Sequence, residues 1–598
     1  MNRRHFVSAL SLFASSRLLA QPAEQEHPAV NDDRAHHDRP AGVNAVTEHV
    51  EAEHVAAPPA AGVQLIATRS GSNLRHGAYH ETRLTPAVVR GGLRKLAELK
   101  LPGDAHGMDA QPLFAAGVSI NGHRKDLILC ATLANRIHAF DCATYKQVWM
   151  TDVGKSVLST NKIDFWGTNQ HFGIMSTPEI VDDKLYVVAW ISPDATREKA
   201  AHFLHELRLS DGKVLRKLKL PGASTTVQRK QRASLASSKT NGKRTLFVPF
   251  GTIQETAANA HGFITAVDID SFTVSDELNL TKDGSGAGVW MAGQAPTVLV
   301  EPDASGRQIT YLVLMTGNGN FEPAKGNFAE CFVKARFDGT FAIVDWWSPW
   351  LDDARGGNGW DDMDLASAGP IVIPELGLVL GAGKDSILYS LDWRKMGKPS
   401  RADLQNDPAG NYARLKTEPI WFGFFPGFGV SAAPNDPKQL NKLFFNKTHH
   451  QHGSPIYWPE KKLMYTWCEN GNLRVGEVQP DGKWKFLARS EEVASPYSPV
   501  PPGGMPGGMM CLSRNGEHDG VIWGCMPDKD ANRAQTFGRV FAFDAADFGE
   551  PMPDGDTQIQ RLWMSDPPHV FAKFNPPIVN DGRLWVPCYD ATVGVWGV

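Results

Sequence analysis

The chain has 598 residues and is 42% hydrophobic, with 56 Gly, 40 Pro and 17 Trp. This composition is typical of a globular protein with many short strands and turns, because Gly and Pro interrupt regular elements, and it argues against a fold of long helices. The 61 basic and 65 acidic residues give a formal charge of -4. No strong basic face is therefore expected, and nucleic acid is not an expected partner.

The first 20 residues have the pattern of an export signal. Arg3 and Arg4 precede an apolar run from Phe6 to about Ser16, and small residues follow near Ala20. The run is too short to cross a bilayer, so we predict a cleaved signal and no transmembrane segment in the mature chain. The two arginines resemble a twin-arginine signal, whereas Arg17 interrupts that pattern, so both export routes stay open. Either route predicts a periplasmic or secreted protein.

Residues 21–62 are rich in Ala, Pro, Glu and His and contain almost no aromatic residue. Such a segment has too little apolar surface to fold alone, so a disordered leader is predicted. Its histidines follow no fixed ligand spacing, which favours a solvated spacer over a metal-binding tract.

From about residue 66 to the C-terminus the sequence repeats. A proline opens one apolar segment after another, and the starts "RASLASS" and "GMMCLSR" continue the series without it. A short apolar strand follows each start, and then an alternating strand that ends at a turn with Asp, which predicts three or four antiparallel strands per unit. The prolines are Pro112, Pro178, Pro296, Pro370, Pro455 and Pro577, and the units begin near residues 111, 176, 232, 294, 367, 452, 508 and 574.

These repeats predict an all-β fold. A four-stranded sheet cannot bury both of its faces alone, and radial packing of many such sheets around an axis buries them while leaving short edges. We therefore expect residues 66–598 to form a β-propeller of eight four-stranded blades. The last unit ends after three strands, and residues 93–103 have the alternation to supply its fourth strand.

Insertions in the repeat are candidate functional loops, because loops on a rigid scaffold often carry function. The largest are residues 351–364 and about 397–448. Asp361, Asp362 and Asp364 have the charge density of a calcium loop but lack the glycine and closing glutamate of an EF-hand, so a solvated acidic turn is expected.

The seven cysteines are scattered singly, which predicts buried free thiols rather than a disulfide framework. Cys511 and Cys525 flank the turn "RNGEHDG" and are the one pair that a hairpin would bring face to face.

Residues just before each unit start are the candidate ligand-binding residues. In a propeller the innermost strands begin at one end of the central channel, so these side chains converge and form a polar ring that suits a small polar ligand. Capping of strand ends, with bound water, is the alternative for the same groups. The ring consists of Gln111, Ser176, Gln294, Ser367, His452 and Lys573, with Trp166, His171 and Trp290 beside it.

The stretch "NKTHHQHGSPIYW" places His450 and His452 on the same side of an extended strand. Two ligands do not complete a zinc site, so a third would have to come from His171 or Asp364. Histidines bonded to water or backbone remain the favoured interpretation, and no metal is assigned.

Several motifs, in order, resemble the pyrroloquinoline-quinone-like (PQQ-like) β-propeller repeat proteins. They include "FGIMSTPEIV", "DMDLASAGPIVIP", "GLVLGAGKDSILYSLDWRKMG", "HGSPIYW" and "FAKFNPPIVNDGRLWV". This superfamily holds quinoprotein alcohol dehydrogenases, a propeller lipoprotein of outer-membrane assembly and an exported subgroup of unknown role. The resemblance runs from about residue 66 to the C-terminus and implies the same fold, whereas activity depends on the site rather than on the fold.

The resemblance carries over no catalytic residue. Quinoprotein dehydrogenases hold their cofactor between a tryptophan and a disulfide of adjacent cysteines, with a calcium or lanthanide ion and an aspartate base. This chain offers Trp166 and Trp290 but no adjacent cysteines, and its carboxylates form no assignable ion-binding pattern.

Three functions are consistent with these observations, and whether the protein is an enzyme stays open. The first is an exported propeller that binds a small polar ligand, a glycan or a protein at the channel mouth. The alternative is an oxidoreductase of alcohols or sugars that depends on pyrroloquinoline quinone with calcium. A hydrolase or lyase with His452 as acid/base rests on that histidine alone.

Overall fold

The computed structural model describes residues 65–104, 107–158, 171–222, 229–253, 257–349, 364–385, 387–407, 410–411, 413–416, 420–421, 450–495, 505–531 and 534–598. In these parts the chain is almost entirely β, with two short α-helices, α1 (Pro86–Arg90) and α2 (Arg401–Asn406). Side-chain oxygens of Thr85 and Ser400 cap their first turns, as is usual for these residue types.

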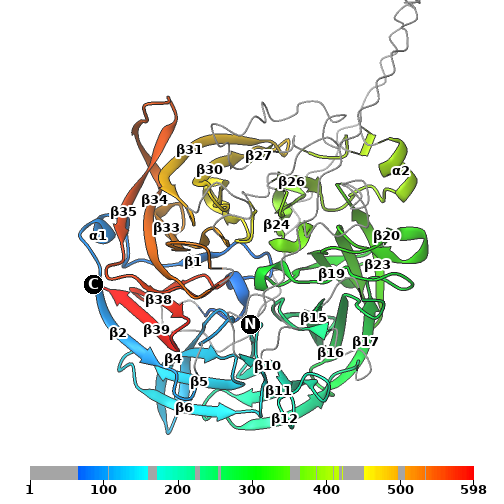
Figure 1. The fold of residues 1–598 in the computed structure, drawn as a ribbon, viewed down its shortest axis with the longest axis horizontal. Helices are drawn as coiled ribbons and strands as arrows, with labels where there is room; N and C mark the ends of the chain where they lie inside the picture. Colours follow the sequence, from blue (N-terminus) through cyan, green and yellow to red (C-terminus); the bar gives the residue numbers. More distant parts are fainter. Residues whose placement is uncertain are drawn as a thin grey trace, which may run out of the picture. The chain divides into compact units, whose positions relative to one another are not determined.

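The strands follow one another in antiparallel groups of four that lie around a common centre in chain order (Figure 1). The first two groups are β3 (Leu113–Ile120), β4 (His123–Ala131), β5 (Arg136–Asp141) and β6 (Gln147–Asp152), then β9 (Glu179–Val181), β10 (Lys184–Ile191), β11 (Ala201–Arg208) and β12 (Val214–Lys219). The next two are β14 (Ala236–Thr240), β15 (Lys243–Thr252), β16 (Phe263–Asp268) and β17 (Thr273–Asn279), then β18 (Thr297–Pro302), β19 (Gln308–Met315), β22 (Phe332–Phe337) and β23 (Phe341–Trp347).

The second half of the chain continues the pattern. It forms β24 (Ile371–Ile373), β25 (Leu378–Ala382), β26 (Ile387–Asp392) and β27 (Ile420–Trp421), then β28 (Ile456–Trp458), β29 (Leu463–Thr466), β30 (Asn472–Val478) and β31 (Trp484–Val493). The last two groups are β32 (Met509–Asn515), β33 (His518–Pro527), β34 (Phe537–Pro551) and β35 (Thr557–Met564), then β37 (Ile578–Asn580), β38 (Arg583–Cys588) and β39 (Thr592–Gly597) with β2 (Arg94–Lys100).

Within the described residues these strands make eight groups, and each begins a few residues after an expected unit start. A single parallel bridge between Arg489 and Gln558 joins the sixth and seventh groups edge to edge. Short pairs stand outside the groups: β7 (Val157–Leu158) with β8 (His171–Phe172), β20 (Phe321–Glu322) with β21 (Asn327–Phe328), β13 (Arg229–Lys230) against β15, and β36 (His569–Val570) against β34.

The two ends of the described chain meet in the last sheet. β2 pairs antiparallel with β39, with Arg94 opposite Gly597 and Lys100 opposite Thr592. In Figure 1 the C-terminus accordingly lies beside β2. The segment expected to complete the last unit, residues 93–103, thus supplies the outer strand of that sheet.

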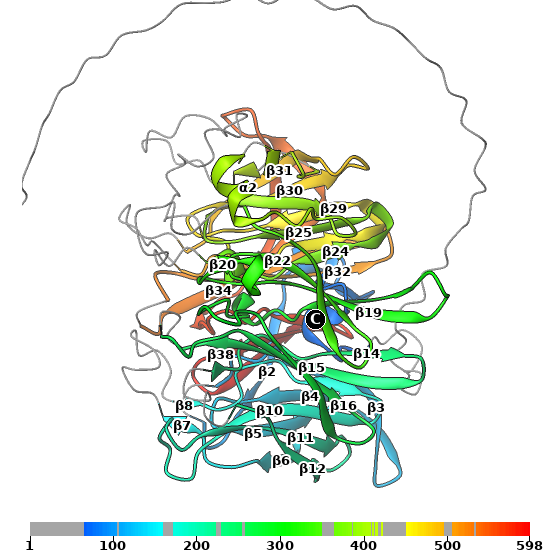
Figure 2. The ribbon, with the colours of Figure 1, turned by 90° about the vertical axis from the view of Figure 1, so that its right-hand side faces the viewer.

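Apolar side chains fill the space between neighbouring sheets, which face each other in the side view (Figure 2). Trp347 is fully buried and packs against Phe332 and Tyr389. Trp346 is partly buried against the same core, so both tryptophans serve packing. Large aromatic side chains contribute most to such interfaces because each removes a large apolar area from water.

A segment at the start of the described chain, residues 66–77, runs along the innermost strands of the sheets in turn, and we name it the strap. An innermost strand otherwise presents unpaired N–H groups, which are costly when buried. The strap carbonyls accept from six of them, and in the first five the donor stands two residues after the recurring proline. The bonds are Phe114 N to Ile66 O (3.1 Å), Ile180 N to Ala67 O (2.8 Å), Val298 N to Asn73 O (3.0 Å), Val372 N to Leu74 O (3.3 Å), Tyr457 N to His76 O (2.9 Å) and Leu512 N to Gly77 O (2.8 Å).

Arg75 holds the strap in this path. Its guanidinium is fully buried and donates to the carbonyl of Pro296 (2.9 Å), to Thr68 Oγ1 (2.7 Å) and to the carbonyls of Arg69 and Ser72. After the strap, β1 (Ala78–His80) pairs in parallel with β32. The strap therefore links the inner edges of the sheets on one side of the centre.

Candidate functional site

Two histidines and a glutamate converge at the centre of the sheets. His450 and His452 precede β28, and Glu469 follows β29, so the β28–β29 hairpin brings them together. His452 Nε2 lies 3.0 Å from Glu469 Oε1, and His450 Nδ1 lies 3.8 Å from Glu469 Oε2. The Glu469 N–H also donates to the His450 carbonyl (3.0 Å), which fixes the two segments side by side. We name these three residues the His–Glu cluster.

Burial controls the charges of the His–Glu cluster. It lowers the pKa of His452 well below its ordinary value, and the nearby His450, Lys384 and Lys573 lower it further. Burial also raises the pKa of Glu469 well above its ordinary value, against the opposing effect of the two lysines. A low-polarity environment disfavours charged forms, so both groups favour their neutral forms in the absence of a cation.

Aromatic rings lie against the cluster. The Phe574 ring packs 5.3 Å from His452 and 4.8 Å from Trp290, measured between ring centroids. Phe574 is buried, whereas Trp290 stays partly exposed. The turn after Trp290 holds Met291 and Ala292 at φ of 49° and 46°, a region that side chains other than glycine rarely adopt. Such backbone strain is common at functional sites, where the surrounding structure holds a side chain in a required position.

Two lysines lie at the same centre. Lys384 is buried and donates to Asp364 Oδ2 (2.7 Å). Lys573 is partly exposed, and its ammonium lies 4.7 Å from the Phe574 ring centroid. A partly exposed indole, packed against a ring that a lysine ammonium also contacts, favours a planar ligand that carries negative charge.

The strap side of the centre is filled by buried charges. Arg69 donates to the Phe574 carbonyl (3.1 Å), and burial lowers its pKa to about 9. Arg232 lies 3.6 Å from Asp109, which also accepts from the Tyr589 hydroxyl. The Arg232 guanidinium packs so close to Gly293 that a Cβ there would lie 2.0 Å from Nη1, which explains the glycine. Trp290 and Lys573, by contrast, are partly exposed.

Four residues of the predicted polar ring are buried and bonded to the protein itself. Gln111 accepts from the Ser70 N–H (3.2 Å) and Gln294 donates to Ser70 Oγ (2.9 Å), so both hold the strap. Ser367 donates to the Gln451 carbonyl (2.7 Å), and Ser176 donates to Gln231. These bonds match the alternative of strand-end capping, and a ligand-binding role for the four stays a prediction.

The other site residues predicted from the sequence do not lie together. His171 lies on β8, where its Nδ1 is 2.8 Å from Ser156 Oγ, and Asp364 binds Lys384. The third member of the histidine group is therefore Glu469, which sequence reasoning missed; its signal is the acid that ends the apolar strand "KLMYTWCEN". Trp166, Asp361 and Asp362 lie outside the described residues, as do residues 351–363 and most of 397–448.

All seven cysteines are described, and each is a buried free thiol. In the β32–β33 ladder Cys511 stands opposite Trp523 and Cys525 opposite Met509, so the pair singled out from the sequence is not in register. Burial raises the pKa of the Cys588 thiol to about 12. These thiols serve packing.

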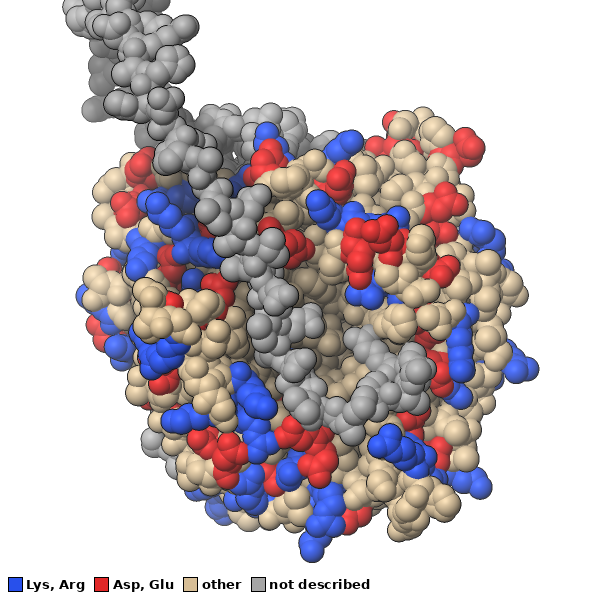
Figure 3. Space-filling view, turned by 180° about the vertical axis from the view of Figure 1, so that it is seen from behind, with Lys and Arg blue, Asp and Glu red and all other residues tan. Residues whose placement is uncertain are grey.

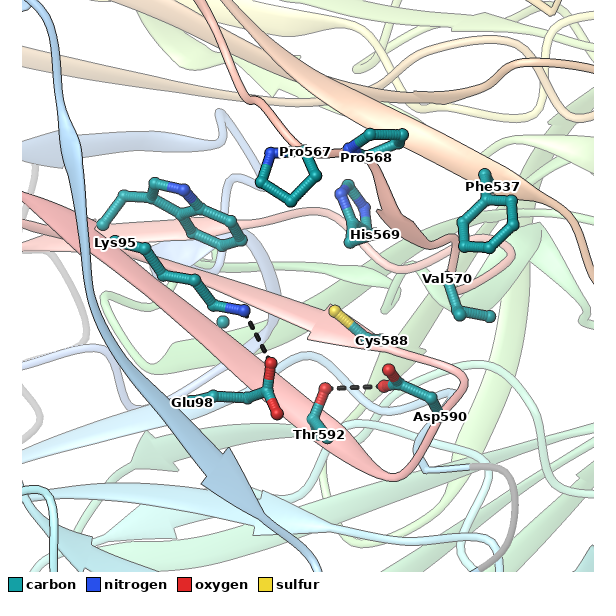
Figure 4. Close-up of a pocket in the computed structure, with 12 residues that line it drawn as sticks. Lys95, Glu98, Phe537, Pro567, Pro568, His569, Val570, Cys588, Asp590 and Thr592 are labelled. Atoms are coloured by element: carbon teal, nitrogen blue, oxygen red, sulfur yellow. Dashed lines mark hydrogen bonds and ion pairs between the residues drawn. The ribbon is translucent and has the colours of Figure 1, made fainter.

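A second feature lies away from the centre, beside the last sheet, and we name it the edge cavity (Figure 4). It has a volume of about 100 Å³. Figure 4 shows Lys95 bound to Glu98 and Thr592 bound to Asp590 below the ring of His569. The lining residues are Lys95, Glu98, Phe537, Pro567, Pro568, His569, Val570, Cys588, Asp590, Thr592, Gly594 and Trp596.

Charged side chains of both signs are interspersed over the face in Figure 3. This distribution agrees with the near-neutral composition and gives no basic stripe of the kind that phosphate backbones require. Among the described helices, none combines the length and apolar character that crossing a bilayer demands.

The fold is similar to those of solved quinoprotein structures. A quinohemoprotein alcohol dehydrogenase from Comamonas testosteroni aligns with 14% sequence identity and a TM-score of 0.51, over 90% of this chain and 81% of that chain. A europium-containing methanol dehydrogenase aligns with 12% identity and a TM-score of 0.51, over 90% of this chain and 98% of that chain. No protein-family profile and no curated protein matches the sequence.

At these identities the likeness shows the fold alone, and the chain is a β-propeller. The prediction of an all-β propeller resembling the PQQ-like repeat proteins is thereby confirmed. Similar folds support many functions, so the activity has to be argued from the residues at the centre.

The described residues do not fit a quinone held with calcium. Calcium takes six to eight oxygen ligands, whereas the His–Glu cluster offers two imidazole nitrogens and one carboxylate. Two further carboxylates are engaged within the protein, since Asp364 binds Lys384 and Asp109 binds Arg232. The thiols are scattered and free, so the disulfide of adjacent cysteines is missing as well. No chemical step through such a cofactor follows from this site.

Proposed function

We propose that the protein is an exported binding protein that holds a small, planar, anionic ligand at the propeller centre. The observation that carries this proposal is the partly exposed Trp290 ring, packed against Phe574, with the Lys573 ammonium 4.7 Å from the centroid of the same Phe574 ring. The aromatic face offers a stacking surface, and the Lys573 ammonium supplies positive charge beside it.

Three features support the placement of this ligand. The strap and the buried Arg69 and Arg232 fill one side of the centre, so the ligand enters from the side of Trp290 and Lys573. The pattern of the first 20 residues supports export. A quinone-dependent oxidoreductase remains the alternative, supported by the fold likeness alone.

Calorimetric titration of the purified mature protein tests the proposal. The probes are benzene-1,3,5-tricarboxylate, a planar anion without redox chemistry, and pyrroloquinoline quinone, each added with and without calcium. We expect both anions to bind without calcium. Lys573→Ala should weaken binding about 10-fold or more, because a charge-assisted contact contributes roughly 1.5–3 kcal/mol.

The matched control is Lys95→Ala, which removes a lysine at the edge cavity and should leave the affinity unchanged. Absence of binding by either anion, or equal losses in the two variants, would overturn the proposal. Binding of the quinone only with calcium, together with dye reduction by an alcohol or sugar, would favour the oxidoreductase instead.

A further inference from the structure

We infer that His450, His452 and Glu469 bind one divalent transition-metal ion, with Zn²⁺ as the best-matched ion. The three side chains are buried, and their ligand-type atoms all lie within 4.8 Å of one another. Two imidazoles and one carboxylate form a common three-residue donor set for zinc, which leaves the fourth position of the tetrahedron for water or another ligand.

The spacing suits a small ion. Ligands at about 2.0–2.1 Å from a tetrahedral Zn²⁺ lie about 3.3–3.4 Å from each other. The His452 to Glu469 separation of 3.0 Å and the His450 to Glu469 separation of 3.8 Å fall on either side of that value. The two separations go to different carboxylate oxygens, and the three donor atoms lie within 4.8 Å of one another, so side-chain rotations are needed to bring them onto one ion.

His452 is poorly satisfied by the protein alone. Neither of its ring nitrogens makes a well-formed hydrogen bond to a described residue, although Nε2 lies near Glu469. Buried polar atoms normally have partners, so a ligand for this ring is expected. The Ser367 backbone lies close enough to act on the ring as an acceptor, which is the usual way to orient a metal-binding imidazole.

The charge of the Glu469 carboxylate and the type of donor atoms favour the same class of ion, a divalent transition metal. Glu469 is fully buried, and a dication next to it would compensate the charge of the ionised carboxylate. Imidazole donors favour Zn²⁺, Cu²⁺ or Ni²⁺ over Ca²⁺ and Mg²⁺, which prefer oxygen. Lys384 and Lys573 act on the same centre and oppose a cation, so the Glu469 carboxylate has to supply the compensating negative charge, and all three donors are the protein's own side chains.

The test is metal titration of the full chain. Five leader histidines, His27, His36, His37, His49 and His54, would bind metal without fixed geometry, so all five are replaced by alanine in the reference protein. After removal of metal with a chelator, we expect one Zn²⁺ per chain by calorimetry. One Co²⁺ per chain should bind with the visible absorption of a tetrahedral site.

Substitutions separate the site from nonspecific binding. His452→Ala and Glu469→Gln should each weaken Zn²⁺ binding by more than the roughly 10–100-fold that loss of an outer partner causes. His202→Ala is the matched control, since His202 is also buried but packs between Trp190 and Phe250. Unfolding curves of the metal-free variants show whether they fold. The cobalt spectrum is recorded on the reference protein, in which His450, His452 and Glu469 are unchanged, so it does not depend on the folding of a variant. No metal uptake, or uptake unchanged in both variants, would overturn the inference.

Discussion

The His–Glu cluster and the edge cavity both contain a histidine with buried ring nitrogens, and they differ in what surrounds it. His452 lies 3.0 Å from a buried carboxylate and against a partly exposed tryptophan, and two lysines act on it electrostatically. His569 packs beside Trp596 at 6.4 Å, and the acids of its cavity are bound by Lys95 and Thr592. Burial alone therefore does not define a site. The centre is the candidate because its donor atoms converge from two segments of the chain.

The largest predicted effect concerns the strap that underlies the centre. Deleting residues 66–77 removes the six backbone hydrogen bonds that the strap carbonyls accept, the bond from the Ile66 N–H to the Phe114 carbonyl, and the Arg75 contacts. At about 0.5–1.5 kcal/mol per bond, the loss approaches a typical total stability of about 5–15 kcal/mol, so the cooperative thermal transition should disappear. Circular dichroism measures it. A deletion of equal length in the leader, residues 30–41, is the control, and an unchanged transition in the strap deletion would contradict the role of the strap.

Leucine substitutions compare the two histidines directly. His452→Leu takes the imidazole away from the buried Glu469 and should lower the free energy of unfolding of the metal-free protein by about 1–3 kcal/mol. His569→Leu removes a ring without a hydrogen-bonded partner among the described residues, so a change under about 1 kcal/mol is expected. Urea unfolding gives both values. Equal losses would show that the acid partner does not distinguish the centre.

The edge cavity should respond to pH through His569. Burial lowers the pKa of His569 from 6.5 to about 4, and Lys95 and Arg539 add to this effect. Between these values the unfolded chain binds a proton that the folded chain does not, so stability falls as pH decreases from 6.5 to 4. His569 is partly exposed, and we expect it to contribute about 1–3 kcal/mol to the change in the free energy of unfolding over this pH range. In His569→Leu the free energy of unfolding, measured from pH 7 to 4.5, should fall less steeply as the pH decreases. A pH profile identical to that of the unsubstituted protein would contradict the lowered pKa.

The smallest effect is expected at the rim of the edge cavity. Lys95 and Lys100 both bind Glu98, and these contacts lower the pKa of its carboxyl group. Solvated ion pairs of this kind contribute at most about 0.2–1 kcal/mol, so Glu98→Gln should change stability by no more than that. Unfolding in low and high salt measures it. A larger loss, or one that salt does not reduce, would show that this rim is more than a solvated ion pair.

The sequence predicted the fold because its signal is local. The recurring proline and the Asp turns punctuate every unit, and the observed strand groups follow those starts. The strap escaped prediction because it acts through backbone carbonyls, which leave no side-chain pattern. Arg75 is its one distinctive side chain, and a single arginine in sequence does not indicate burial.

The site was predicted in part. His452 was placed at the centre from its position before Pro455, but Glu469 was not, because its approach depends on the β28–β29 hairpin and on the bond from its N–H to the His450 carbonyl. Gln111 and Gln294 occupy the positions from which a ring was expected, and there they bind Ser70 of the strap. Position in the repeat therefore predicted which side chains lie at the centre. It did not predict which of them are already hydrogen-bonded within the protein.

Anomalous X-ray diffraction from crystals soaked in Zn²⁺ tests the central claim most directly. We predict a zinc peak at the propeller centre, about 2.0–2.2 Å from one nitrogen of each imidazole and from a carboxylate oxygen of Glu469. The peak should be absent from identically soaked crystals of Glu469→Gln. A map of the unsubstituted protein with no peak between His450, His452 and Glu469 would contradict the account.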